Sequence, residues 1–294
     1  MDTDRTAGRE ILRYAAFSRD PAAGNPAGVV PDATGLATSE MQRIAAEVGF
    51  SETAFLFQDS ADPGQLTVRY FSPLAEVTFC GHATIASAVA LAERQGPGRI
   101  VLDTMAGEVV VHSRYDEQGA LVAALTSVAP WVEELAADDL DKLLGSLRWE
   151  AADLDPALPS RVAYAGAWHP VLAVTTRARL AALDYDFDRL ARLMGARDWT
   201  TIQLVWRETE RRFHVRNPFP PGGVVEDPAT GAAAAAFGAY LRAVELVTPP
   251  QQVTLVQGED MGRPSRLTVD IPVGDGPITV AGHAVVMPTA HPIS

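Results

Sequence analysis

The chain has 294 residues, 47% of them hydrophobic, which is enough to build the cores of two domains of ordinary size. Its formal net charge of −13 repels phosphate backbones and anionic lipid, so we expect neither a nucleic acid nor a membrane as a partner. The single cysteine, Cys80, allows no internal disulfide, and the N-terminus lacks the basic-then-apolar order of a secretory signal. These features predict a soluble cytoplasmic protein.

Three helices are predicted in chain order. The first follows a capping-box pattern at residues 39–42 and carries Met41, Ile44, Ala45 and Val48 at helical spacing. The second covers about residues 83–93 and the third about residues 229–245. Both are rich in alanine and apolar on every face, which is typical of a buried helix. The apolar run at 231–241 is shorter than the ~20 residues that would cross a bilayer.

Most of the remaining sequence is predicted to form strands, because apolar and polar residues alternate between glycine- and proline-rich turns. Examples are residues 66–71, 108–111, 201–206 and 212–216. Glu52 stands at the beginning of another apolar stretch, Thr53–Phe57. Glutamate is rarely buried without a partner, so this carboxyl group is either satisfied by hydrogen bonds or kept for proton transfer.

Two parts of the chain resemble each other and indicate a degenerate duplication. Val68-Arg69 leads through a loop to Ala83-Thr84, and Val215-Arg216 leads through a similar loop to Ala229-Thr230. Each pattern is a strand, a loop and the start of an alanine-rich helix. The predicted layout is therefore many strands curling around one buried helix, present twice, with a boundary near residues 127–130.

The duplication places two helix N-termini after two loops. Unpaired backbone N–H groups and a partial positive charge at such an end attract a carboxylate. Gly81 and Gly231 would allow a ligand to approach the backbone closely. His82, Asp227 and Glu52 add three titratable groups with different intrinsic pKa values, which is a plausible proton-transfer set.

Each of these residues also has a structural explanation when it is taken alone. Asp227 would cap its helix, His82 would be a buried structural histidine, Glu52 would lie on the surface at a strand end, and Cys80 would be a small core residue. The joint pattern favours catalysis. The six histidines show no ligand pairing, and the dinucleotide, nucleotide and hydrolase motifs are missing, so we expect neither a metal nor a cofactor.

Several segments together resemble the PhzF (phenazine biosynthesis-like) family, in order from about residue 11 to residue 286. These segments are Gly24–Val29, Ser51–Phe55, Phe79–Thr84, Glu226–Gly231, Gln257-Gly258 and Met261–Pro264. The resemblance implies an α+β, diaminopimelate epimerase-like fold with two pseudo-symmetric halves. Each half is a curled, mostly antiparallel β-sheet or barrel around a central helix. The first half comprises residues 1–127 with a returning strand at 278–294, and the second comprises residues 128–277.

The resemblance also implies an activity. The family's best-known member isomerises trans-2,3-dihydro-3-hydroxyanthranilate, and its proton-shuttling glutamate is matched here by Glu52. The family's histidine and aspartate, which help to bind and polarise the substrate, are matched by His82 and Asp227. We therefore expect a cofactor-independent isomerase of a small carboxylate, working as a homodimer.

Four further residues are expected to contact the substrate: Cys80, Gly81, Gly231 and Ala232. Ala232 stands where the best-known member has serine, so a hydroxyl group is missing and the substrate itself is not fixed by the resemblance. Two alternatives stay open. One is an amino-acid epimerase or racemase that uses Cys80 and Asp227, since a single thiol excludes a symmetric two-thiol mechanism. The other is a non-catalytic small-molecule-binding protein of the same fold.

Overall fold

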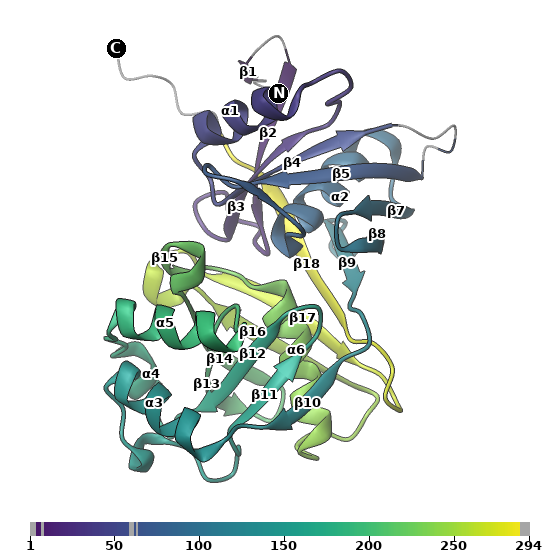
Figure 1. The fold of residues 1–294 in the computed structure, drawn as a ribbon. Helices are drawn as coiled ribbons and strands as arrows, with labels where there is room; N and C mark the ends of the chain where they lie inside the picture. Colours follow the sequence, from purple (N-terminus) through teal and green to yellow (C-terminus); the bar gives the residue numbers. More distant parts are fainter. Residues whose placement is uncertain (1–3, 7–8, 59–61, 63, 289–294) are drawn as a thin grey trace. The chain divides into compact units, whose positions relative to one another are not determined.

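The computed structural model describes residues 4–6, 9–58, 62 and 64–288. Its contacts divide the chain into two compact units, which we describe separately (Figure 1). Unit 1 contains residues 1–126 and 281–294, and unit 2 contains residues 127–280. Residues 289–294 of the predicted returning strand lie outside the described residues.

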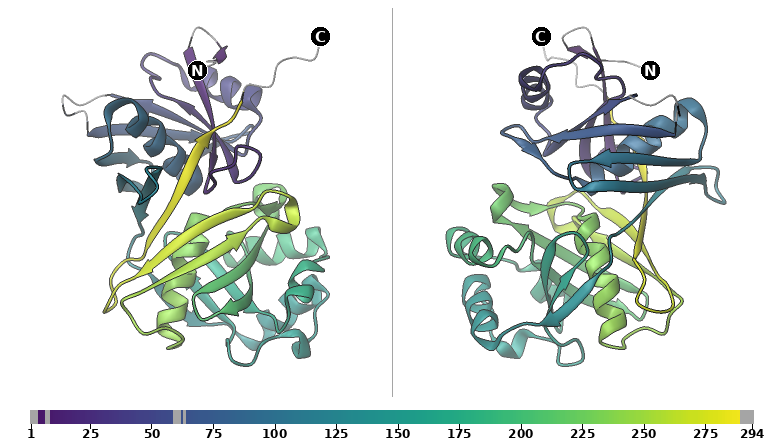
Figure 2. Two further views of the ribbon diagram at one scale, coloured as in Figure 1. Left: turned by 180° about the vertical axis from the view of Figure 1, so that it is seen from behind. Right: turned by 45° about the vertical axis from the view of Figure 1, so that its right-hand side comes forward.

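Unit 1 is built on a closed ring of eight strands. The described strands of unit 1, of which all but β1 and β6 belong to the ring, are β1 (Asp4–Thr6), β2 (Arg9–Ala16), β3 (Asn25–Val30), β4 (Glu52–Phe57), β5 (Gln65–Phe71), β6 (Glu76–Val77), β7 (Arg99–Thr104), β8 (Gly107–Tyr115), β9 (Leu121–Thr126) and β18 (Thr279–Val286). The ring runs β2-β3-β4-β5-β7-β8-β9-β18 and returns to β2. Figure 2 follows β18 through this unit, where Ala284–Val286 pair with β2. A closed ring leaves no free edge among these strands.

Helix α2 (Gly81–Gln95) fills the ring and is buried from His82 to Ala92. It contacts β2, β3, β4, β8 and β9, and its many alanines let the strands come close on every side. Helix α1 (Thr38–Val48) packs Met41, Ile44, Ala45 and Val48 into the core, as predicted. The predicted cap at residues 39–42 is wrong, because the helix starts earlier and Glu40 accepts a hydrogen bond of 2.9 Å from the Ala37 N–H.

Unit 2 repeats this plan around a second buried helix. Its strands are β10 (Trp131–Glu134), β11 (Arg161–Tyr164), β12 (Trp168–Ala173), β13 (Gln203–Thr209), β14 (Arg212–Phe219), β15 (Val224–Asp227), β16 (Gln251–Gln257) and β17 (Ser265–Ile271). Helix α6 (Gly231–Ala243) is buried against β10, β11, β12 and β17 (Figures 1 and 2). Three short 3-10 turns lie at Ala151–Asp153, Pro220–Gly222 and Glu259–Met261.

Unit 2 also contains three helices that the sequence analysis did not predict: α3 (Ala137–Leu147), α4 (Arg177–Ala181) and α5 (Phe187–Arg197). They pack a narrow apolar stripe against the core, with Leu143 and Leu147 on α3 and Leu190 and Met194 on α5. Charged residues cover their other faces, so the acidic sequence of α3 looks like a linker.

The order of strand pairing confirms two pseudo-symmetric halves. In unit 1, β3 and β4 are parallel, β4 pairs antiparallel with β5, and β5 is parallel to β7. In unit 2, β12 and β13 are parallel, β13 pairs antiparallel with β14, and β14 is parallel to β16. A buried helix enters at the same point in both sequences, between β6 and β7 and between β15 and β16.

An arginine–glutamate pair marks the same place in each half. Arg69 on β5 donates two hydrogen bonds of 2.6 Å to Glu76 on β6, and Arg216 on β14 pairs with Glu226 on β15. The predicted match between the two Ala-Thr pairs is wrong. Ala83-Thr84 lies inside α2, whereas Ala229-Thr230 precedes α6, so the helix-start glycines are the equivalent residues.

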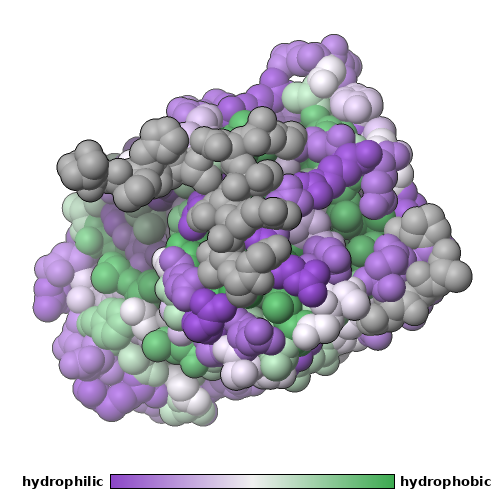
Figure 3. All heavy atoms as spheres, turned by 90° about the horizontal axis from the view of Figure 1, so that it is seen from above, coloured by the Kyte–Doolittle hydropathy of each residue, from purple (hydrophilic) through white to green (hydrophobic). Residues whose placement is uncertain are grey.

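One face of the molecule is mixed in character. On the face seen in Figure 3, hydrophilic side chains separate several smaller hydrophobic areas. Among the described residues, no helix has the length and apolar character that crossing a membrane requires.

We expect His169 to make the stability of the protein depend on pH. It is completely buried in unit 2, and burial lowers its pKa from 6.5 to about 4, although a hydrogen bond with the Thr201 backbone acts in the opposite direction. The unfolded chain therefore takes up a proton near pH 6.5 while the folded chain does not. The contribution of neutral His169 to the free energy of unfolding is fully present above pH 6.5, and about 3 kcal/mol is lost as the pH drops to about 4.

Urea unfolding of the wild type and His169→Gln across this range measures the effect. The wild type should lose this stability between pH 6.5 and 4 and His169→Gln should not, so the free-energy difference between the two proteins should change with pH. The exposed His112→Gln serves as the matched control and should follow the wild type. Parallel curves for the wild type and His169→Gln would contradict a buried neutral His169.

Candidate active site

Glu52 lies at the beginning of β4, one of the strands of the ring in unit 1. Helix α1 ends at Gly49, whose φ of 72° is in the left-handed region, and the chain then turns into β4 with Glu52 as its first residue. The next four residues, Thr53–Leu56, are completely buried. Only 16% of the Glu52 side chain is exposed, so its carboxyl group is drawn into the protein and away from bulk solvent.

Cys80 and His82 lie at the start of the central helix. Cys80 is the N-cap residue of α2, and His82 is the second residue of the helix. The Thr84 N–H and hydroxyl both donate to the Cys80 carbonyl, at 3.0 and 2.7 Å, and Tyr70 bonds the same hydroxyl at 2.6 Å. These bonds fix the turn that carries Cys80 and His82, which are both buried.

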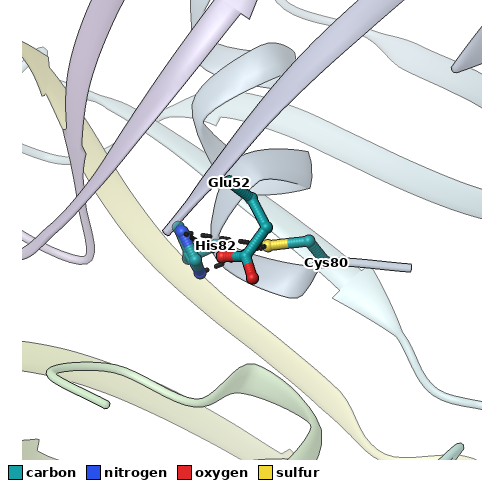
Figure 4. Close-up of side chains that lie close together, drawn as sticks. All are labelled: Glu52, Cys80 and His82. Atoms are coloured by element: carbon teal, nitrogen blue, oxygen red, sulfur yellow. Dashed lines mark hydrogen bonds and ion pairs between the residues drawn. The ribbon is translucent and has the colours of Figure 1, made fainter. Parts of the chain in front are cut away.

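The structure brings Glu52, Cys80 and His82 together (Figure 4). The Cys80 thiol donates to Glu52 Oε2 at 3.6 Å, and its Sγ lies 3.3 Å from His82 Nδ1. His82 Nε2 lies 3.4 Å from the same Glu52 oxygen and 3.3 Å from Ser51 Oγ. The three side chains, distant in sequence, thus form one contact group.

Burial raises the pKa of the Glu52 carboxyl group, and hydrogen bonds from Ser51 and Cys80 offset part of this rise. Desolvation disfavours the charged form, while a donor directed at the carboxylate favours it. The two effects work against each other, so both protonation states are accessible nearer to neutral pH than for an exposed glutamate. A group of this kind can accept and return a proton.

The same three residues could also hold a metal ion, although the sequence analysis expected none. Their donor atoms all lie within 4.8 Å of one another, and thiolate, imidazole and carboxylate are the ligand types that zinc uses. The sequence analysis named all three residues as site candidates, but it could not show that their donor atoms meet, since Glu52 lies 28 residues before Cys80 on a different element.

Of the other predicted site residues, Gly81 is the first residue of α2 in unit 1, and Asp227, Gly231 and Ala232 belong to unit 2. Asp227 ends β15, and Thr230, the N-cap of α6, donates its hydroxyl to Asp227 Oδ2 at 2.6 Å. Gly231 is the buried first residue of α6, and the partly buried Ala232 follows it. The structure therefore groups Asp227, Gly231 and Ala232 around the start of the second central helix.

Gln257 is a residue of this region that sequence reasoning did not single out. Its amide nitrogen donates to the Asp227 carbonyl at 2.6 Å and to Thr230 Oγ1 at 3.0 Å, and its oxygen accepts from the Thr230 N–H at 3.1 Å. The buried side chain thus fixes the turn between β15 and α6. Only its place in the Gln257-Gly258 segment could have pointed to it.

The second residue of that segment, Gly258, occupies a position that only glycine fits. Its φ of 75° is in the left-handed region, and a Cβ atom there would lie 2.4 Å from the Arg263 carbonyl oxygen and 2.9 Å from that of Pro228. Any larger residue would push these two backbones apart. The segment is therefore a structural support for the turn that carries Asp227.

A comparison with protein families now identifies the chain. Residues 14–290 match the model of the PhzC-PhzF family, described as "Phenazine biosynthesis-like protein". The chain belongs to this family. The fold expected from the resemblance is also that of the PhzF-family protein of Bacillus anthracis, which has a TM-score of 0.84, is 29% identical, and is matched over 95% of this chain and 96% of that one.

Curated relatives add the type of reaction. A Mesorhizobium japonicum protein named an uncharacterized isomerase is 33% identical over 94% of this chain and 96% of its own length. The trans-2,3-dihydro-3-hydroxyanthranilate isomerase of Pseudomonas chlororaphis is 31% identical over 85% of this chain and 86% of its own. The PhzF-family chain is therefore an isomerase, which favours catalysis over the alternative of a non-catalytic binding protein.

We expect Gln257→Ala to lower the free energy of unfolding by about 1–3 kcal/mol, because it removes three hydrogen bonds of a buried side chain to the partly buried turn at Asp227 and Thr230. Urea unfolding measures this loss. Gln252→Ala is the matched control, since Gln252 lies on the same strand but is exposed, and its effect should stay within about 0.5 kcal/mol. Equal effects of the two substitutions would contradict the supporting role of Gln257.

Proposed function

We propose that this isomerase moves a proton between two carbons of a small carboxylate, with Glu52 as both base and acid. The supporting observation is the position of the Glu52 carboxyl group, which is withdrawn from solvent and in contact with Cys80 and His82 at the start of α2. A carboxylate that is poorly solvated is a better base than an exposed one, because burial raises its pKa.

The proton moves in two balanced steps. Glu52 as a carboxylate takes a hydrogen from a substrate carbon, which leaves the electron pair of the C–H bond on the substrate and a neutral carboxylic acid on the protein. The pair then moves through the neighbouring unsaturation to a second carbon, which takes the proton back from Glu52. The enzyme ends as it began, so the cycle needs no redox partner.

The substrate carboxylate is proposed to bind at the first turn of α2. Cys80 caps this helix with its backbone alone, since its side chain makes no capping hydrogen bond. The N–H groups of the first turn, including those of Gly81 and His82, and the positive end of the helix dipole favour an anion there. His82 would polarise the bound molecule, and the Cys80 thiol would donate to Glu52 whenever it is ionised.

Asp227, Gly231 and Ala232 are proposed to take part in substrate recognition. This proposal rests on the family resemblance and on the fixed turn around Asp227, which Gln257 and Thr230 hold. Ala232 offers no hydroxyl group, so a substrate that needs a donor at this position would bind less well. The homodimer remains a prediction of the resemblance.

The substrate to test first is trans-2,3-dihydro-3-hydroxyanthranilate, because a relative that is 31% identical is named for it. A panel of small unsaturated cyclic carboxylates should follow, since Ala232 marks a departure from the family's best-known member. Incorporation of deuterium from heavy water reports proton transfer even where the equilibrium of a reaction lies on the substrate side.

With the best substrate of the panel, Glu52→Gln should lower kcat and deuterium incorporation by at least about 10²–10⁴-fold, since the amide can neither take nor return the proton. The exposed Glu47→Gln is the matched control and should keep the wild-type rate. A Glu52→Gln protein that is folded and nearly as fast as the wild type would end the proposal.

The contact of Cys80 with both Glu52 and His82 favours a second candidate, an epimerase or racemase in which Cys80 and Asp227 are the two bases. Cys80→Ala separates the two in the same assay. If Glu52 is the base, loss of one thiol hydrogen bond should cost no more than about tenfold. If the thiol is the base, the loss should equal that of Glu52→Gln.

A further inference from the structure

A chain of hydrogen bonds runs from the core of unit 1 to the start of helix α2. The Thr84 hydroxyl donates to the Cys80 carbonyl at 2.7 Å, and Tyr70 Oη lies 2.6 Å from Thr84 Oγ1. A hydroxyl group has one hydrogen, and Thr84 gives it to the carbonyl, which can only accept. Tyr70 is therefore the donor to Thr84, and the chain has one direction, from Tyr70 through Thr84 to Cys80.

Tyr70 is fixed in the core of unit 1. It lies on β5 opposite Ala54 of β4, is only 1% exposed, and meets the ring of Phe79 edge to face with 6.0 Å between the centroids. Burial raises the pKa of the Tyr70 phenol, so the hydroxyl keeps its proton and remains a donor. A buried hydroxyl is costly without a partner, so Tyr70 and Thr84 hold each other in place.

The Cys80 carbonyl and the Gly81 N–H belong to one peptide group. This group is planar and trans, so the two bonds point in opposite directions and turn together. The carbonyl accepts both the Thr84 N–H, at 3.0 Å, and the Thr84 hydroxyl. Hydrogen bonds in series polarise one another, so bonding at the carbonyl strengthens the N–H as a donor. Gly81 is the first residue of α2, where N–H groups have no partner within the helix.

We propose that Tyr70 is a positioning residue of the isomerase, which acts through Thr84 to orient and polarise the Gly81 N–H toward the substrate carboxylate. This inference rests on the proposed function, in which the first turn of α2 binds that carboxylate. The buried Tyr70 does not touch the substrate itself. Its effect is therefore expected on the binding of the carboxylate and not on the proton transfer.

The N-cap residue explains why this helix start is held through its carbonyl. A serine, threonine, aspartate or asparagine at the N-cap fixes the first turn by bonding its N–H groups. The Cys80 side chain makes no such bond, and its thiol contacts Glu52 and His82 instead. Thr84 and Tyr70 hold the turn from the opposite side, which does not use the N–H groups that an anion would bind.

Unit 2 shows that the fold does not require this chain. The equivalent of Tyr70 is Asn217, the residue after the arginine of the matching arginine–glutamate pair. The equivalent of Thr84 is Ala234, three residues after the glycine that begins α6. Ala234 has no hydroxyl, and its N–H makes the ordinary helical bond to the Thr230 carbonyl at 3.0 Å. The chain thus belongs to the half that carries the proposed base.

The NMR signal of the Gly81 amide proton measures the polarisation without any ligand. In Tyr70→Phe and Thr84→Val it should move upfield, because weaker bonding at the carbonyl leaves the N–H less polarised. Phenylalanine keeps the aromatic ring, and Thr84→Ser, which keeps the hydroxyl, should retain the wild-type signal. Tyr14→Phe is the matched control, since Tyr14 is also buried and its hydroxyl donates at 2.6 Å to Glu93, near the other end of α2.

The rate assay measures the consequence for binding. With the best substrate of the panel, Tyr70→Phe should raise KM about 2–10-fold and leave kcat within about twofold, because a weakened bond to the unreacting carboxylate acts on ground state and transition state alike. Tyr14→Phe should change neither value. A purely structural role would lower the stability of both tyrosine variants and move neither the Gly81 signal nor KM.

An unchanged Gly81 signal in Tyr70→Phe would overturn the inference, whatever the kinetics, and this variant decides alone if Thr84→Val does not fold. A shifted signal with an unchanged KM, or a loss confined to kcat, would overturn the positioning role in carboxylate binding. Failure of the proposed function is distinguishable from both, because it would appear as a nearly unimpaired Glu52→Gln protein.

Discussion

The account depends on the contact between the Glu52 carboxyl group and the start of helix α2. A carboxylate taken out of water loses solvation, and here Ser51 and the Cys80 thiol return only part of it. The result is a group that holds a proton more firmly than an exposed glutamate, yet still releases it. Proton transfer between carbons needs this balance, since one residue must act first as a base and then as an acid.

The fold creates this contact by enclosing a helix in a ring of strands. Since α2 is buried among β2, β3, β4, β8 and β9, its first turn lies close to the ends of these strands. Glu52 is the first residue of β4, so its side chain reaches the helix N-terminus without crossing the core. Unit 2 repeats the plan around α6 and places Asp227 before the equivalent helix start. The residues at the two helix starts differ, because Cys80 and His82 have no thiol or imidazole counterparts in Thr230 and Ala232.

The sequence was informative where chemistry follows from local pattern. The alanine-rich apolar patterns around residues 83–93 and 229–245 predicted both central helices. The position of Glu52 before an apolar strand indicated the carboxyl group that the structure buries. Other features depend on contacts between distant residues. No local pattern shows that Gln257 would hold Asp227, or that Cys80 would contact both Glu52 and His82. Helix α3 was not predicted because its many acidic residues make the segment look like a loop, although Leu143 and Leu147 recur at helical spacing.

The most direct test of the central claim is a carbon-13 NMR titration of the Glu52 carboxyl group, assigned by the signal that disappears in Glu52→Gln. The account predicts a midpoint clearly above the ordinary value of 4.5, because burial outweighs the hydrogen bonds from Ser51 and Cys80. A midpoint at or below 4.5 would show a well-solvated or fully compensated carboxylate and would contradict the proposed role of Glu52.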